Sequence, residues 1–208
     1  TDAMLSRTGE TGEPAVRAWT PHRQVAFGRR DAADAGYERA VAAARAQGFE
    51  PVERAVGGRA VAYTGSTVAF AHAVPVDGGR TGIDARYRAT TDRIRTALVD
   101  LGVDATPGEP PDSFCPGDHS LQAGGKLVGV AQRVRADAAL VAGCVVVDDR
   151  EAFAAVLEAV YDALGRPFDP GSVGSVAAAG GPSDPERVRT AVERELVGDA
   201  ATVRRIAV

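Results

Sequence analysis

The sequence has 208 residues, of which 45% are hydrophobic and 25% charged, and these values are ordinary for a soluble globular protein. A net charge of −4 argues against a nucleic-acid-binding protein, and no apolar run reaches the roughly 18–20 residues of a membrane span. No secretory signal is visible at the start, so we expect a cytoplasmic protein, and the missing initiator Met leaves a longer natural N-terminus open. The length predicts a single domain, residues 1–208.

Apolar spacing and turn residues predict strands and helices that alternate irregularly along the first half of the chain. In this half we expect strands over residues 15–19, 24–28, 49–54 and 61–74, and helices over residues 32–47 and 84–101. The segment Val76-Asp77-Gly78-Gly79 is expected to be a loop between the last of these strands and the second helix.

The second half of the chain contains longer breaker-rich connections. In this half we expect a link over residues 106–111, strands over residues 127–134 and 138–147, a helix over residues 151–164, and a Gly/Pro/Ser-rich connection over residues 167–182. A last helix should begin with Ser183 or Asp184 as its cap, carry Pro185 in its first turn and reach Val197, within a helical tail of about residues 183–208. The pattern predicts an α/β or α+β fold, a mixed β-sheet with flanking helices.

Lys126 is the only lysine among 24 basic residues. Coding bias or adaptation to salt can produce an excess of Arg, yet one position has kept the compact ammonium that Arg cannot imitate. Either Lys126 has a function that needs this group, or it is a surface lysine that survived by chance.

Two cysteines, Cys115 and Cys144, are expected to be thiols rather than a disulfide. Cys115 precedes a Pro-Gly turn, which favours presentation on a loop, although a small buried hydrophobic residue is the common alternative. His119 follows four residues later, with its acid–base role open. Cys144 lies in a β-branched run and is predicted to be core. The three histidines show no metal-ligand spacing, so no metal site is expected.

Two glycine-rich stretches could approach a ligand closely. Residues 54–61 place Gly57 and Gly58 between Arg54 and Arg59, where a plain turn is the alternative. The second stretch, residues 124–133, leads into a strand through Lys126, and could accommodate an acyl carbonyl or phosphate or simply form a hairpin with an exposed lysine.

Taken together, these stretches resemble a known family. Arg-x-x-Gly-Gly-x-Ala-Val, followed roughly seventy residues later by Gly-Lys-x-x-Gly-x-Ala-Gln-Arg, resembles the two signature blocks of the lipoate–protein ligase and octanoyltransferase superfamily. The resemblance extends over nearly the whole chain and implies a fold similar to the catalytic domain of biotin ligases, with an apolar tunnel for the acyl chain.

The resemblance also implies roles for individual residues. Lys126 would lie beside the acyl carbonyl. The residues expected to bind the substrate are Arg54, Gly57, Gly58, Arg59, Ala60, Tyr63, Gly129, Ala131 and Gln132. The His-Asp pair that commonly follows Gly-Gly-x-Ala-Val in the family is replaced by Tyr63-Thr64, so this chain departs from the family pattern on the acceptor or phosphate side.

Cys115-Pro116-Gly117 stands eleven positions before Lys126 and resembles the Cys-Pro-Gly element of cysteine-dependent octanoyl and lipoyl transferases. It implies that Cys115 forms an acyl thioester and that Lys126 assists, without a cofactor. The implied partners are lipoyl-carrier domains, namely the glycine cleavage H protein and the acyltransferase subunits of 2-oxoacid dehydrogenases, with acyl carrier protein as a further candidate. A monomer is expected. The alternatives are a ligase that uses Lys126 with ATP and magnesium, and a non-catalytic relative that binds lipoyl domains.

Overall fold

A computed structural model of the chain describes residues 1–54, 57–77, 81–199 and 202–204. Ala55 and Val56 of the first glycine-rich stretch, Gly78 and Gly79 of the expected loop, and the end of the expected helical tail lie outside the described residues. Within the described ranges the strands form a six-stranded and a three-stranded sheet, with helices packed on both. The expected fold class, a mixed α/β arrangement, is confirmed.

The larger sheet is antiparallel and has the strand order β1-β5-β9-β8-β7-β6. Its strands are β1 (Ala15–Trp19), β5 (Val68–Pro75), β6 (Thr106–Pro107), β7 (Leu121–Gln122), β8 (Lys126–Val134) and β9 (Ala138–Val145). The long pair β8 and β9 was predicted from its β-branched runs, whereas β6 falls in the segment expected to be a link. Because Lys126 begins β8, the sheet fixes its main chain.

The smaller sheet has β2 (Gln24–Phe27) at its centre, with β3 (Glu50–Glu53) parallel and β4 (Val61–Tyr63) antiparallel to it. The strand expected over residues 61–74 is therefore wrong as a single element, since β4 and β5 belong to different sheets. A turn separates them, in which the Thr64 amide donates to the Thr67 hydroxyl (3.3 Å) and Gly65 has a φ of 93°. This turn carries the chain from one sheet to the other.

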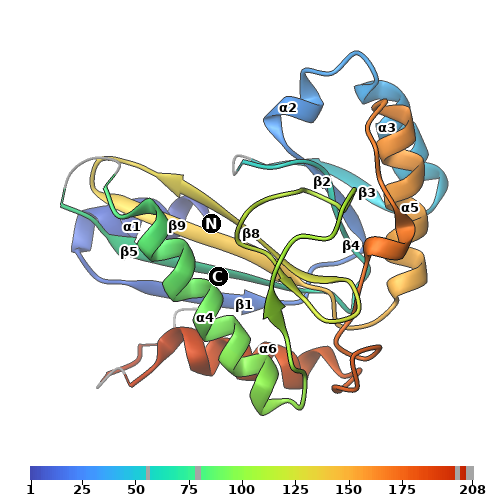
Figure 1. Cartoon of the computed structure of the whole chain (residues 1–208). Helices are drawn as coiled ribbons and strands as arrows, with labels where there is room; N and C mark the ends of the chain where they lie inside the picture. The colour runs from blue at the N-terminus through green and yellow to red at the C-terminus, as the bar shows by residue number, and fades with distance from the viewer. Residues whose placement is uncertain (55–56, 78–80, 200–201, 205–208) are drawn as a thin grey trace.

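The helices cover both sheets (Figure 1). They are α1 (Asp2–Thr11), α2 (Arg29–Ala32), α3 (Tyr37–Ala46), α4 (Ile83–Asp100), α5 (Arg150–Ala163) and α6 (Pro185–Val197), with a 3-10 turn, η1 (Pro170–Ser172). Helices α4 and α6 share a core with the larger sheet, α1 packs against β5 and β9, and α3 and α5 enclose the core of the smaller sheet. None of the helices in the described ranges combines the length and apolar character needed to cross a membrane.

The helix expected over residues 32–47 is interrupted, and residues 33–36 separate α2 from α3. The Asp34 carboxylate accepts a hydrogen bond from the Gly36 amide (2.9 Å) and pairs with Arg166 (3.1 Å), which draws this segment against the end of α5. Gly36 packs so closely there that a Cβ would lie 2.2 Å from the Ala163 carbonyl oxygen. The predicted Asp184 cap of α6 is confirmed, because its side chain accepts from the Glu186 amide (2.9 Å). Helix α1 was not predicted.

Candidate active site

Cys115 lies on the loop between β6 and β7, as its Pro-Gly neighbour predicted. Its main chain has a φ of 42°, a left-handed conformation that non-glycine residues seldom adopt and that clusters at functional sites. The half-buried sulfur accepts hydrogen bonds from the Arg59 amide (3.2 Å) and the Arg54 guanidinium (3.5 Å). Both donors stabilise negative charge on the sulfur, so the thiol has the surroundings of a nucleophile.

The loop that brings these donors to Cys115 depends on close main-chain packing. A Cβ on Gly58, whose φ is 101°, would lie 2.5 Å from the Cys115 sulfur, and a Cβ on Gly28 would lie 1.9 Å from the Gly58 carbonyl oxygen. Glycine is therefore needed at both positions. A Cβ on Gly57 would have no atom of the described residues within 4 Å, so the tight approach belongs to Gly58 rather than to the pair.

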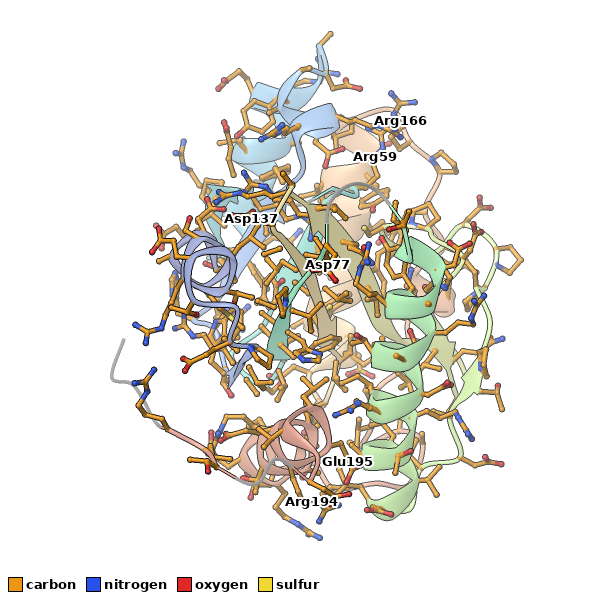
Figure 2. All side chains as sticks on the ribbon, turned by 90° about the vertical axis from the view of Figure 1, so that its left-hand side faces the viewer. Arg59, Asp77, Asp137, Arg166, Arg194 and Glu195 are labelled. Carbon is orange, nitrogen blue, oxygen red and sulfur yellow. The ribbon has the colours of Figure 1, made fainter. Side chains whose placement is uncertain are left out.

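Arg59 anchors the same loop through its side chain. Its guanidinium pairs with Asp31 (3.0 Å), whose fully buried carboxylate also accepts from the Gly28 amide (3.1 Å). Figure 2 shows Arg59 at the end of the molecule formed by α2 and α3, far from Arg194 and Glu195 on α6. The Arg59 side chain thus holds the loop in place while its amide faces the sulfur.

Lys126 is fully buried, which excludes the interpretation as a chance surface lysine. Its ammonium donates to the Phe114 carbonyl (2.8 Å), the Cys115 carbonyl (3.0 Å) and the Glu109 carboxylate (2.8 and 3.0 Å). These partners account for all three ammonium protons. Glu109 neutralises the buried charge and was not predicted from the sequence; Ser113 donates in turn to Glu109.

A cavity of about 180 Å³ opens beside Cys115 between the two sheets. Four of the residues expected to bind substrate line it: Arg54, Tyr63, Gly129 and Ala131. The other lining residues are Thr1, Trp19, Pro21, Gln24, Ala26, Val52, Val61, Ala69, Phe70, Cys115, Val130, Ala142, Gly143 and Cys144. These are mostly apolar, so the cavity suits a hydrocarbon chain with its reactive end at the thiol.

The other expected binding residues lie outside the described lining of this cavity. Gly57, Gly58, Arg59 and Ala60 belong to the loop around the sulfur, and Lys126 lies behind the main chain of Cys115. Gln132 accepts from the Arg86 side chain (3.0 Å) and donates to the Ile83 carbonyl (3.2 Å), so it fastens the start of α4 to β8.

Cys144 is buried on β9, as predicted, and also lines the cavity, which was not predicted. Burial raises the pKa of its thiol to about 11, so at neutral pH it stays protonated. Burial likewise raises the pKa of the Tyr63 hydroxyl, which remains a neutral donor in the cavity wall. The first glycine-rich stretch directs hydrogen-bond donors at the sulfur of Cys115. Within the described ranges it directs none at the sulfur of Cys144.

Two aromatic residues contact the Cys115 loop from other elements. The Tyr161 hydroxyl on α5 accepts from the Cys115 amide (2.6 Å), and Tyr87 on α4 stacks on His119 with ring centroids 4.2 Å apart. Neither contact was predicted. Across the described part of the chain, no three His, Cys, Asp or Glu residues gather as ligands of a metal ion would.

Known proteins resemble this chain in sequence and in fold. The family described as the lipoyl protein ligase A/B catalytic domain matches residues 1–197. The octanoyl-[GcvH]:protein N-octanoyltransferase of Exiguobacterium sibiricum is 32% identical over 133 residues, 64% of this chain and 48% of that protein. The lipoyl-[GcvH]:protein N-lipoyltransferase of Listeria monocytogenes is 27% identical over 134 residues, 64% of this chain and 48% of that protein. This chain thus spans about half the length of the curated relatives it matches.

Solved structures share the fold at low sequence identity. Lipoate–protein ligase A bound with ATP superposes with a TM-score of 0.75 at 22% identity, covering 94% of this chain and 76% of that one. A putative lipoate protein ligase from T. acidophilum with bound lipoic acid gives 0.70 at 22%, covering 94% and 77%. The resemblance seen in the sequence motifs is confirmed, and the chain belongs to the lipoyl protein ligase A/B catalytic domain family.

Proposed function

We propose that this chain is the catalytic domain of an acyltransferase that moves an octanoyl or lipoyl group through a thioester on Cys115 to the lysine of a lipoyl-carrier domain. The observation that carries the proposal is the Cys115 sulfur at the wall of an apolar cavity, with the Arg59 amide 3.2 Å away. The names of relatives that transfer octanoyl or lipoyl groups from GcvH to protein support it.

In the first step the Cys115 sulfur attacks the carbonyl carbon of an octanoyl- or lipoyl-lysine amide on the donor. A C–S bond forms, the C–N bond breaks, and the proton lost by the thiol ends on the departing amine. The Arg54 guanidinium and the Arg59 amide stabilise the charge on the sulfur before attack. The cavity holds the hydrocarbon chain and excludes water from the thioester.

Lys126 assists the reaction from the far side of the Cys115 main chain. Its ammonium is charged and held by Glu109, so it can stabilise an oxyanion once it exchanges one carbonyl bond for the acyl oxygen. A hydrogen bond from a charged donor is shorter and stronger than one between neutral groups. This fixed ammonium is the reason that we assign oxyanion stabilisation to Lys126, the only lysine of the chain.

In the second step the amine of the acceptor lysine attacks the thioester. A C–N bond forms, the C–S bond breaks, the amine gives up a proton and the Cys115 thiol is restored. The transfer needs neither metal nor bound cofactor. The proposed partners are the glycine cleavage H protein and the acyltransferase subunits of 2-oxoacid dehydrogenases. Acyl carrier protein is a further donor: from its acyl thioester, a new C–S bond to Cys115 forms, the old C–S bond breaks, and the carrier thiol leaves with the proton. The proposed setting is a cytoplasmic monomer.

The test is transfer from octanoylated H protein to an unmodified lipoyl domain without ATP, followed by intact mass spectrometry of both carriers. The proposal predicts octanoylation of the acceptor by the wild type and none by Cys115→Ala. Modification from free octanoate with ATP and magnesium, equally by Cys115→Ala, would replace the proposal with a ligase. Binding of the lipoyl domain without any transfer would replace it with a non-catalytic function.

A further inference from the structure

Tyr161 connects three segments that are far apart in the sequence. It lies on α5, is almost completely buried, and accepts a 2.6 Å hydrogen bond from the Cys115 amide through its hydroxyl oxygen. The same hydroxyl donates to the carbonyl oxygen of Ala60 at 3.1 Å. One side-chain oxygen therefore joins the loop that carries the thiol to the loop that carries the Arg59 amide.

Both hydrogen bonds are made to main-chain atoms, one in each of the two loops that meet at the reacting sulfur. The Cys115 amide belongs to the residue with the left-handed backbone, and such a conformation persists only where its surroundings hold it. Ala60 follows Arg59 directly, so the bond to its carbonyl restrains the main chain two peptide units after the amide that faces the sulfur. The Tyr161 hydroxyl is thus a direct link between the two loops, in addition to the Asp31 and Lys126 contacts that hold each loop separately.

The surroundings of Tyr161 suit this task. Phe168 packs against its ring, with centroids 5.2 Å apart, and fixes its direction. Burial raises the pKa of the Tyr161 hydroxyl, so it keeps its proton and can accept one hydrogen bond while donating the other. Residues 116–118, directly after Cys115, are exposed, so the Tyr161 hydroxyl holds the Cys115 main chain at the edge of the exposed part of the loop.

We propose that Tyr161 is the positioning residue that sets Cys115 against the Arg59 amide for attack. The proposal rests on the proposed function in that Cys115 must be the nucleophile. Tyr161 does not contact the acyl group. It acts only through the main chain of Cys115 and Ala60. Losing its hydroxyl should therefore slow acyl-enzyme formation while leaving binding of the donor unchanged.

The first test compares Tyr161→Phe with Tyr37→Phe, which removes a hydroxyl bonded to Glu53 at the surface (3.1 Å). Single-turnover formation of the acyl-enzyme is followed by mass spectrometry at several donor concentrations, with circular dichroism to verify folding. We expect Tyr161→Phe to lower the maximal rate roughly 10- to 100-fold with the donor KM within about twofold, and Tyr37→Phe to match the wild type. Equal rates for both variants, or a change in KM alone, would overturn the proposal.

The wild type in the same experiment separates this inference from the proposed function. If the wild type forms no acyl-enzyme, the proposed function has failed. If the wild type forms it and Tyr161→Phe forms it at the same rate, only the role of Tyr161 has failed.

A second measurement, hydrogen exchange, needs no variant. With ¹⁵N-cysteine labelling, the chain gives two amide signals, from Cys115 and Cys144.

Hydrogen exchange of these two amides tests the bond itself. We expect the Cys115 amide to exchange slowly in the wild type, approaching the strand amide of Cys144, although residues 116–118 that follow it are exposed. Exchange of the Cys115 amide at the rate of an unstructured peptide would contradict the hydrogen bond to Tyr161 and overturn the proposal, even if Tyr161→Phe failed to fold.

Discussion

The ammonium nitrogen of Lys126 lies 3.0 Å from the main-chain carbonyl oxygen of Cys115, so the two residues expected to carry the chemistry are in direct contact. The contact reaches the main chain of the cysteine rather than its sulfur. Lys126 therefore holds the loop from behind, while the Arg59 amide approaches the sulfur from the glycine-rich loop.

We expect Lys126→Arg to lower acyl-enzyme formation by about 100-fold or more in a folded protein. The ammonium is enclosed by Glu109, two carbonyls and the Phe114 ring (4.8 Å), and this space does not admit a forked guanidinium in the same geometry. The single-turnover rate checks the prediction, with Arg133→Lys near the other end of β8 as the matched control. A Lys126→Arg variant that kept most of its rate would show that position 126 needs charge alone.

Glu109→Gln should lower the free energy of unfolding by roughly 1–3 kcal/mol, because it leaves the ammonium of Lys126 buried without a counter-charge. The lower part of this range allows for the 24% exposure of the Glu109 side chain. Urea unfolding at neutral pH measures the change. Glu13→Gln makes the same substitution in an ion pair with Arg204 whose side chains are both 62% exposed, and it should change stability little. Equal losses in the two variants would refute the buried-charge explanation.

Gly28→Ala should inactivate the protein more than Gly57→Ala, although position 57 belongs to the Arg-x-x-Gly-Gly-x-Ala-Val signature block and position 28 lies outside both signature blocks. An added Cβ at position 28 meets the Gly58 carbonyl at 1.9 Å and pushes the loop away from the sulfur, whereas position 57 has room. We expect at least about a tenfold lower rate for Gly28→Ala and a near wild-type rate for Gly57→Ala. The same rate assay decides, and the reverse order of the two variants would contradict the packing.

Lowering the pH from 7.5 to 5 should destabilise the protein through His72 by roughly 1–2 kcal/mol. Burial, and secondarily the charge of Arg93, lowers the pKa of His72 from 6.5 to about 4. The unfolded chain thus binds a proton between these values that the folded chain does not, and stability falls as the pH falls through this window. Urea unfolding at both pH values, compared with His72→Gln, checks it. His72→Gln should remove this part of the pH dependence of the free energy of unfolding. An unchanged pH dependence in this variant would contradict the assignment to His72.

The sequence predicted most strands and helices of the fold because their periodicity and caps are local. Helix α6 with Asp184 as its cap and the strand pair β8 and β9 are examples. Helix α1 and the short strands β6 and β7 were not predicted, and two further errors have tertiary causes. The segment of residues 33–36 is drawn out of a helix by Arg166 and the end of α5, and β4 and β5 separate because the chain changes sheets at the turn after Tyr63.

The residues of the site likewise divide into those that a local sequence pattern identifies and those that only the fold brings together. Cys115, Lys126 and the glycine-rich stretch could be found from residue type and motif, since each has an uncommon local pattern. Glu109 and Tyr161 could not, because they reach the site across 17 and 46 residues and have no motif of their own. A buried ammonium must find a carboxylate, but the sequence left the burial of Lys126 open, and only the fold identifies the partner.

The most direct test of the central claim is the location of the acyl thioester after the protein is mixed with octanoylated H protein without ATP. Peptide mass spectrometry on the wild type, Cys115→Ala and Cys144→Ala measures it. Because burial raises the pKa of the Cys144 thiol to about 11, we predict an octanoyl group on Cys115 in the wild type and in Cys144→Ala, and none in Cys115→Ala. An acyl-enzyme that persists in Cys115→Ala and disappears in Cys144→Ala would contradict the account.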